Sequence, residues 1–322
     1  MKIKNNSKTK ILNDLIRIRI IEEEIAKEYK HQQMRCPVHL SIGQEAIPVG
    51  VSSVLTKKDY IVSTHRCHAH YLAKGGSLDA LLGELYGKET GTCKGVGGSM
   101  HMYDDKVNHL GSVPIVGGSI PVGVGIGYAI KLNKLKNVSV IYFGDAATEE
   151  GVFFESLHFA ALKKLPVIFV CEDNEYSVYT SKYERHGKRD IKKLVKSMDV
   201  KFMEAKKNDV NDIQTKAKLA KKYALTKGPV FLYSKTYRYV EHCGPNNDDD
   251  LNYRPKNEVN YWKNKDPIQL EIKKLKKLKI FNEDKYLNHC SSIRKNFIKS
   301  LIKTKNAKSL PIKKLKYLEY AK

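Results

Sequence analysis

Hydrophobic and polar positions along the chain alternate in blocks that predict buried parallel strands joined by helices. Residues 138–143 (VSVIYF) are a run of mainly β-branched and aromatic side chains, and residues 167–174 (VIFVCEDN) begin with a similar apolar run, as in parallel strands covered on both faces. Between them, residues 151–165 carry an apolar face at helical spacing, formed by Phe154, Leu157, His158, Ala161 and Leu165. Pro166 ends this predicted helix. The order strand, helix, strand is that of a βαβ unit.

The same patterns predict further elements and an overall α/β fold, with a parallel sheet flanked by helices. Helices are expected at 8–30, 43–56, 77–87 and 211–227, and short strands at 59–64 and 229–237. A glycine-rich stretch at 91–127 shows little periodicity until about Pro121, and short Lys-rich amphipathic helices follow Trp262. We therefore divide the chain into an N-terminal helical arm (1–30), an α/β domain (31–262) and a Lys-rich helical extension (263–322).

The chain of 322 residues carries a formal net charge of +23, and most of its basic residues are lysines. Arginine is the usual residue for bidentate recognition of bases and phosphates, and lysine does not replace it. The lysines are also spread widely, so a solvated basic surface is a simpler reading than a nucleic-acid interface, and we expect no nucleic-acid partner.

The cysteines are scattered without CxxC pairs, and the basic N-terminus leads into no apolar segment of signal-peptide type. These features favour a reducing compartment, and we expect a cytoplasmic protein. Residues 110–130 lack charge over a length that could span a membrane, but Pro114, Pro121 and several glycines lower their hydrophobicity. We expect a buried loop and helix there, and no membrane partner.

Two polar residues follow the two strands of the βαβ unit. Asp145 lies just past the end of the first strand and Asn174 lies at the same end of the second, so both are expected at the carboxyl edge of the sheet, where ligands bind in parallel α/β folds. Carboxylate, amide and carbonyl oxygens suit Mg²⁺ together with phosphate oxygens. Gly144 allows a sharp turn before Asp145. From spacing alone, Asp145 could equally be a helix cap and Asn174 a turn residue.

Several motifs, in order, resemble the α subunits of thiamine-diphosphate-dependent 2-oxoacid dehydrogenases, the E1 components. The segment GDAATEEGVFFESLHFAALKKLPVIFVCEDNEYSVYT is similar to their cofactor motif, which runs from Gly-Asp-Gly to an Asn about thirty residues later. Similar motifs occur at 39–46 (HLSIGQEA), 63–75 (STHRCHAHYLAKG), 95–102 (GVGGSMHM), 111–129 and 236–242 (TYRYVEH). The resemblance covers about residues 10–270, and it implies the thiamine-diphosphate-binding fold.

The resemblance also implies roles for individual residues. Asp145, Asn174 and the backbone carbonyl of Tyr176 would hold Mg²⁺, and Arg66, with His65 beside it, would bind the diphosphate of thiamine diphosphate. The remaining cofactor contacts would come from Ile115 and Val116 at the aminopyrimidine and from Gly144, Ala146 and Ala147 near the diphosphate. His68 and His242 would face the channel used by the substrate and the lipoyl group, as catalytic residues.

The activity implied is oxidative decarboxylation of a pyruvate-like 2-oxoacid, with acyl transfer to a lipoyl-bearing E2 partner. A β subunit would supply the other half of the cofactor site, in an α₂β₂ assembly.

The sequence departs from the family pattern at two places that concern cofactor binding and substrate choice. Ala146 stands where the family has the second glycine of Gly-Asp-Gly, so a methyl group could crowd the diphosphate. The loop at 243–255 also differs from the usual family sequence, which leaves the choice of 2-oxoacid open.

Other hypotheses remain open at this stage. An acetoin-cleaving dehydrogenase α subunit, another thiamine enzyme or a non-catalytic relative would share these motifs. His65, His68 and His70, with His39 and Cys67, could instead ligate zinc. Glycines at 117–127 lack the GxGxxG order of a dinucleotide loop, so Gly123 and Gly127 are expected to permit close helix packing.

Overall fold

A computed structural model describes residues 3–34, 36–205 and 208–315 of the chain. Its centre is a six-stranded sheet in the order β2-β1-β3-β4-β8-β7, in which every neighbouring pair is parallel. The strands are β1 (Tyr60–Thr64), β2 (His109–Val113), β3 (Ser139–Gly144), β4 (Val167–Asp173), β7 (Lys201–Ala205) and β8 (Val230–Lys235). A small antiparallel hairpin, β5 (Tyr176–Ser177) and β6 (Thr180–Ser181), follows β4. The predicted α/β fold with a parallel sheet is confirmed.

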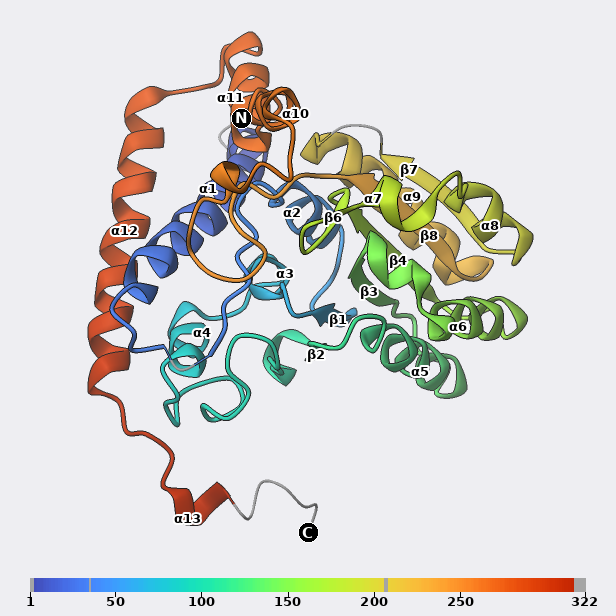
Figure 1. Cartoon of the computed structure of the whole chain (residues 1–322), viewed down its shortest axis with the longest axis horizontal. Helices are drawn as coiled ribbons and strands as arrows, with labels where there is room; N and C mark the ends of the chain where they lie inside the picture. The colour runs from blue at the N-terminus through green and yellow to red at the C-terminus, as the bar shows by residue number, and fades with distance from the viewer. Residues whose placement is uncertain (1–2, 35, 206–207, 316–322) are drawn as a thin grey trace.

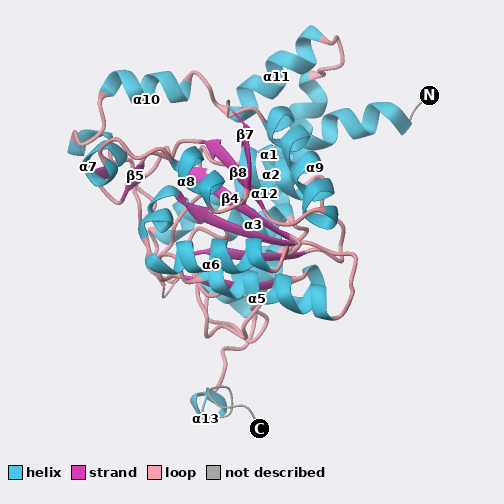
Figure 2. Cartoon of the chain, turned by 90° about the vertical axis from the view of Figure 1, so that its right-hand side faces the viewer, coloured by secondary structure: helices cyan, strands magenta, loops and turns pink. Residues whose placement is uncertain are grey.

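Helices cover both faces of the sheet, because successive residues of each buried strand point to opposite sides. On one face, α5 (Ser119–Leu132), α6 (Gly151–Leu162) and α8 (Ile191–Ser197) pack against Ile141, Phe143 and Phe169. Figure 2 shows α5 and α6 side by side in front of the strands. On the other face, α1 (Ile3–Tyr29), α2 (Ala46–Ser52) and α9 (Val210–Thr226) pack around Val140 and Val170.

The remaining helices complete the second face and the carboxyl-terminal part. They are α3 (His68–Ala73), α4 (Leu78–Leu85), α7 (Lys182–His186), α10 (Lys256–Lys263), α11 (Pro267–Lys277), α12 (Glu283–Asn306) and α13 (Ile312–Leu315), with short 3₁₀ turns η1 (Asp105–Val107), η2 (Asp145–Glu149) and η3 (Asp249–Leu251). The long helix α12 lies against α1 and α4 at one side of the molecule (Figure 1). One core cluster includes Leu15, Ile61 and Phe297, so it draws on all three predicted parts of the chain, whose division stays a prediction.

The βαβ unit agrees with the pattern in the sequence, but the buried face of its helix does not. β3 and β4 are paired neighbours in parallel register, joined by α6. The helix buries Phe153, Ser156, Leu157 and Ala160, whereas the predicted face included His158, which is exposed. The true face is therefore rotated by about one position, because the helix is apolar almost all round and its pattern is ambiguous.

One element is longer in the structure than predicted, and two strands were not predicted. The C-terminal helices were expected to be short, yet α12 has 24 residues. Strands β2 and β7 were not predicted, because HLGSV and KFMEA are short and carry polar residues or glycine. Residues 110–130 form part of β2, a loop and most of α5, as expected for a loop and helix. Within the described ranges, no helix combines the length and the apolar character needed to cross a bilayer.

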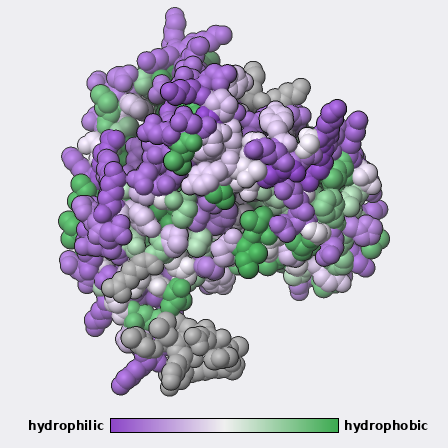
Figure 3. All heavy atoms as spheres, viewed as in Figure 1, coloured by the Kyte–Doolittle hydropathy of each residue, from purple (hydrophilic) through white to green (hydrophobic). Residues whose placement is uncertain are grey.

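The face in Figure 3 is covered mainly by polar and charged residues, with small separate hydrophobic patches. Lysines of α11 and α12, such as Lys273, Lys285 and Lys299, are exposed. This distribution fits a solvated basic surface.

The glycines of α5 let this helix approach the sheet closely. A Cβ atom at Gly123 would overlap the side chain of Ile141, and one at Gly127 would overlap Val167. Gly125, on the exposed side of the same helix, has open space where a Cβ atom would lie. The expectation that Gly123 and Gly127 permit close helix packing is confirmed.

We predict opposite effects of alanine at these two kinds of position. Gly123→Ala should lower the free energy of unfolding by about 1–3 kcal/mol, because the added methyl group overpacks the core. Gly125→Ala should raise it by up to about 1 kcal/mol, because alanine favours a helix and meets no neighbour. Urea denaturation of the two variants measures both changes, and equal effects would show that α5 does not pack as described.

Candidate active site

A cavity lies at the carboxyl ends of β1, β3 and β4, where a parallel α/β sheet places its ligands. Most of the predicted site residues line it: His65, Arg66, Val116, Gly144, Asp145, Ala146, Ala147, Asn174, Tyr176 and His242. These residues come from segments as distant in the sequence as β1 and the loop after β8. The parallel topology brings them together by ending neighbouring strands at one edge.

Asp145 begins the 3₁₀ turn η2 directly after β3 and is buried. Burial and the neighbouring carboxylate of Asp173 raise the pKa of Asp145 to about 7, while the Arg185 guanidinium acts in the opposite direction. Arg185 of α7 forms an ion pair with Asp145 and another with Glu149. A buried carboxylate beside a second carboxylate favours a cation close to it.

Asn174 follows β4, and Gln44 orients its side chain. The Asn174 Nδ2 donates to Gln44 Oε1 at 3.0 Å, and the backbone N–H of Tyr176 donates to Asn174 Oδ1 at 3.2 Å. Asn174, Tyr176 and Asp145 line the same cavity, and each carries an oxygen of the kind that a hard cation prefers. Gln44, from the motif at 39–46, was missed as a site residue, although its place in that motif was a usable signal.

Arg66 follows β1, and its guanidinium is fully buried without a carboxylate partner among the described residues. It donates to the backbone carbonyl oxygens of Leu40 and His242, at 2.5 and 3.2 Å. Burial, with the nearby Arg238, lowers the pKa of Arg66 to about 9. A buried cation at the wall of a cavity, bound only by neutral carbonyls, suits an anionic ligand.

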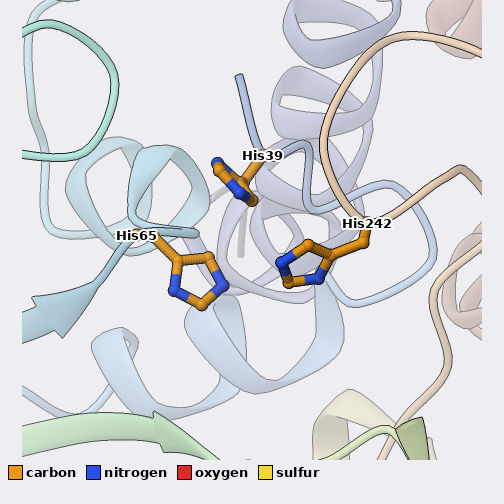
Figure 4. Close-up of side chains that lie close together, drawn as sticks. All are labelled: His39, His65 and His242. Atoms are coloured by element: carbon orange, nitrogen blue, oxygen red, sulfur yellow. The ribbon is translucent and has the colours of Figure 1, made fainter. Parts of the chain in front are cut away.

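Three histidines face one another in the same region (Figure 4). The rings of His39, His65 and His242 have centroids 4.6–5.4 Å apart, and all three residues line the cavity. Burial is the largest cause that lowers their pKa values, to about 2 for His39 and about 3 for the other two, and Arg66 adds to it. The three imidazoles are therefore neutral near pH 7. His39 was missed as a cavity residue.

His68 does not face the cavity, and its predicted catalytic place is wrong. It begins α3 and is fully buried, with Nδ1 2.9 Å from Glu22 and Nε2 2.8 Å from the Ser99 hydroxyl. The start of α3 turns its side chain toward α1. His68 thus links α1, α3 and the glycine-rich loop as a structural residue.

The residues first considered as zinc ligands, namely His65, His68 and His70 with His39 and Cys67, do not come together as one site. His70 contacts Ser63 and Glu172, and Cys67 is buried, with a pKa raised to about 12 by burial. Glu172, which lies inside β4 and lines the cavity, was missed because its segment has the pattern of a fully buried strand. Only His39 and His65 of the proposed zinc set lie together, and His242 joins them.

Ile115 does not line the cavity either, although its neighbour Val116 does. The Ile115 side chain is 73% exposed. It lies in the loop between β2 and α5, between Pro114 and Val116, which do line the cavity. Of the two residues predicted to contact the aminopyrimidine, only Val116 is in place to contact a ligand in the cavity of this chain.

Ala146 causes no backbone strain. It lies in η2 and is not among the non-glycine residues with positive φ, so a glycine is not required there. We expect Ala146→Gly to change the affinity for thiamine diphosphate by less than about threefold, a difference below about 0.7 kcal/mol. Calorimetric titration of both proteins measures this. A large gain on substitution would instead favour the non-catalytic hypothesis.

Comparison with known proteins decides the family. The family described as Dehydrogenase E1 component matches residues 13–313. The chain belongs to this family. It is 38% identical over 258 residues to "Pyruvate dehydrogenase E1 component subunit alpha-1, mitochondrial" of Arabidopsis thaliana, which covers 78% of this chain and 64% of that protein. The match to "Pyruvate dehydrogenase E1 component subunit alpha" of Rickettsia bellii is 36% identical over 267 residues, and covers 83% of this chain and 81% of the relative.

The resemblance to dehydrogenase E1 α subunits is therefore confirmed, and so is the predicted class of enzyme, an oxidoreductase acting on an oxo group. Membership of the E1 family implies dependence on thiamine diphosphate. The matched region spans about two thirds of the Arabidopsis relative.

Proposed function

We propose that this chain is the α subunit of an E1 component that decarboxylates a pyruvate-like 2-oxoacid oxidatively, with thiamine diphosphate and Mg²⁺, and passes the acyl group to a lipoyl-bearing E2. The observation that carries the proposal is the meeting of two ligand sites in one cavity. Asp145, Asn174 and Tyr176 offer oxygens for a hard cation, and Arg66 is a buried cation without a carboxylate. A Mg²⁺-bound diphosphate has the charges that both require.

The roles of the chain's own residues follow from their positions. The carboxylate of Asp145, Oδ1 of Asn174 and the carbonyl of Tyr176 would hold Mg²⁺, and Arg66 would bind the diphosphate. The backbone N–H groups of Ala146 and Ala147, which line the same cavity, would be further donors. When bound, thiamine diphosphate supplies the electron sink for loss of CO₂.

His242 would contact the substrate as a neutral group. Its low pKa leaves the imidazole unprotonated near pH 7, so one ring nitrogen can donate a hydrogen bond to the substrate and the other can accept one. The neutral ring therefore cannot serve as a cationic partner of the substrate carboxylate. His65 and His39 share this neutral state.

A β subunit would complete the site, in an α₂β₂ assembly. The cavity of this chain encloses about 190 Å³, whereas ligand pockets usually enclose roughly 300–1,000 Å³. Ile115, next to the cavity residue Val116, is 73% exposed, and α5 and α6 expose Leu132 and Leu162 at 62% and 67%. Exposed apolar side chains mark a protein-binding surface where they lie together, as Tyr128 of α5 and Phe159 of α6 do with ring centroids 5.6 Å apart. The chain purified alone is expected to show no turnover.

We also propose a reducing compartment such as the cytoplasm. The six cysteines, all within the described residues, are free. Proteins of oxidising compartments more often carry disulfides.

Dye reduction by the chain co-purified with its β partner tests the proposed activity. Pyruvate, 2-oxoisovalerate, 2-oxobutyrate and acetoin are each supplied with and without thiamine diphosphate and Mg²⁺. Turnover of one 2-oxoacid that needs both additions is the expected result, and it also names the substrate. Turnover of acetoin alone would assign the acetoin-cleaving alternative, and cofactor binding without any turnover would contradict the proposed activity.

A further inference from the structure

Glu84, near the end of α4, carries a buried carboxylate outside the cavity described above. Its side chain is only 1% exposed, and it is not among the residues that line the cavity. Within the described part of the chain, the donors to this carboxylate are backbone N–H groups and not lysine, arginine or histidine. A carboxylate taken out of water without a cationic partner needs its full set of hydrogen bonds.

Four backbone N–H groups of one loop supply those hydrogen bonds. Glu84 Oε2 accepts from Cys93 at 2.6 Å and from Gly95 at 3.0 Å. Glu84 Oε1 accepts from Gly97 at 2.7 Å and from Gly98 at 3.0 Å. Gly95 and Gly98 have positive φ angles of 83° and 61°, and backbone of this kind can turn several N–H groups toward one anion. The carboxylate is therefore the anion around which the loop is folded.

The same loop, residues 93–101, reaches the cavity at its far end. The Ser99 hydroxyl lies 2.8 Å from Nε2 of His68, and the Ser99 carbonyl accepts from Sγ of Cys67 at 3.1 Å. The next residue, Met100, lines the cavity. The 93–101 loop is thus held by Glu84 on one side and by His68 on the other, with Met100 beyond the second anchor.

We propose that Glu84 is a positioning residue for the active-site cavity, because its carboxylate is the internal anion that holds the 93–101 loop, and with it Met100, in place. Without the carboxylate, four N–H groups converge on a space with no acceptor, and the loop opens so that water can satisfy them. The effect on the loop does not depend on the proposed function. The effect on cofactor binding rests on it.

Glu84→Ala tests the effect on the loop in the full chain. Hydrogen exchange of residues 93–98 should become at least about tenfold faster, because charge-assisted bonds to four amides are lost. The Cys93 thiol, which is half-buried and donates to the His101 carbonyl at 3.0 Å, should react with iodoacetamide faster as well. Mass spectrometry of the peptides measures both rates. Unchanged exchange in β3 and β4 shows that the fold is retained.

Acetate separates the role of the anion from that of the side-chain volume. The substitution Glu84→Ala deletes a CH₂–COO⁻ group, which acetate matches. Acetate should therefore slow both the exchange and the labelling of the Glu84→Ala protein, whereas sodium chloride at the same concentration should not. Glu84→Gln keeps the shape and one acceptor oxygen, so it should release two of the four amides and give intermediate rates. It carries the test if Glu84→Ala does not fold.

Glu89→Ala is the matched control. Glu89 follows α4 on the same segment and pairs with Lys314 at 3.3 Å, and among the described residues it accepts no bond from the 93–101 loop. Its substitution should leave the exchange and the labelling of the loop unchanged. Loop rates in Glu84→Ala that equal those of the original protein, or an equal acceleration in Glu89→Ala, would overturn the proposal.

The consequence for the cavity is measured by calorimetric titration of thiamine diphosphate, with Mg²⁺, into the assembled α and β chains. Glu84→Ala should weaken binding at least about fivefold, because displacement of a cavity wall disturbs ligand placement, and acetate should restore part of the affinity. An opened loop with unchanged affinity would overturn the positioning role. Failure of the unaltered complex to bind the cofactor would instead contradict the proposed function, and the exchange and labelling results would still decide whether Glu84 holds the loop.

Discussion

Asp145→Asn should lower cofactor-dependent turnover by at least about 100-fold, because changing even an indirect partner of a metal costs 10–100-fold. Asparagine keeps the shape of the side chain but removes the negative charge from the proposed Mg²⁺ ligand. Arg185 loses its ion-pair partner at the same time, yet it retains Glu149. The loss should therefore come from weaker binding of Mg²⁺ and thiamine diphosphate, and it should shrink at high Mg²⁺ concentration.

Asp199→Asn is the matched control. Asp199 is an exposed carboxylate with φ of 57°, a conformation that asparagine tolerates. It removes the same charge far from the site, and turnover should stay within about twofold of the original, a difference below about 0.5 kcal/mol. Near-normal turnover with a normal Mg²⁺ dependence in Asp145→Asn would show that Asp145 is not a ligand of the metal.

The substitution Arg66→Met should have opposite effects on the thermal stability of the protein and on its affinity for thiamine diphosphate. The folded protein holds a buried guanidinium without a carboxylate, and burial lowers the pKa of Arg66 to about 9 from 12.5. A base with a lowered pKa opposes folding in its charged form, and this penalty is present in full below about pH 9. Methionine keeps the apolar volume and removes the charge, so the cofactor-free protein should melt at the same temperature or higher.

The affinity of Arg66→Met for thiamine diphosphate should fall by at least about 10–100-fold, since a charge-assisted bond to a buried anion contributes roughly 1.5–3 kcal/mol. Arg294→Met, which removes a half-exposed arginine on α12, should alter neither property by much. Melting curves and calorimetric titrations of the two variants give both quantities. A destabilised Arg66→Met protein with unchanged affinity would mean that Arg66 is a structural residue.

The central part of the fold could be predicted because its signals are local. β3, α6 and β4 follow one another along the chain, and the two strands are unbroken apolar runs. The buried face of α6 could not be predicted, because Phe153, Phe154, Phe159 and Leu162 surround the helix with apolar groups. Only the packing of Phe153 against Phe143 and Phe231 settles which side is inside.

The site was predictable where a residue ends a strand, and less so elsewhere. Asp145 and Asn174 follow paired parallel strands, so their nearness follows from topology. The meeting of His39 with His242 depends on the bridge between His39 and Gly244, which no local pattern reveals. His68 was misplaced because the turn into α3, and not the motif, sets the direction of its side chain.

The most direct test of the central claim is calorimetric titration of thiamine diphosphate into the co-purified α and β chains, with and without Mg²⁺. We predict one cofactor per α chain, with binding that needs Mg²⁺ and is weakened by both Asp145→Asn and Arg66→Met. Binding that ignores Mg²⁺ and both substitutions, or no binding by a correctly assembled complex, would contradict a thiamine diphosphate and magnesium site in this cavity.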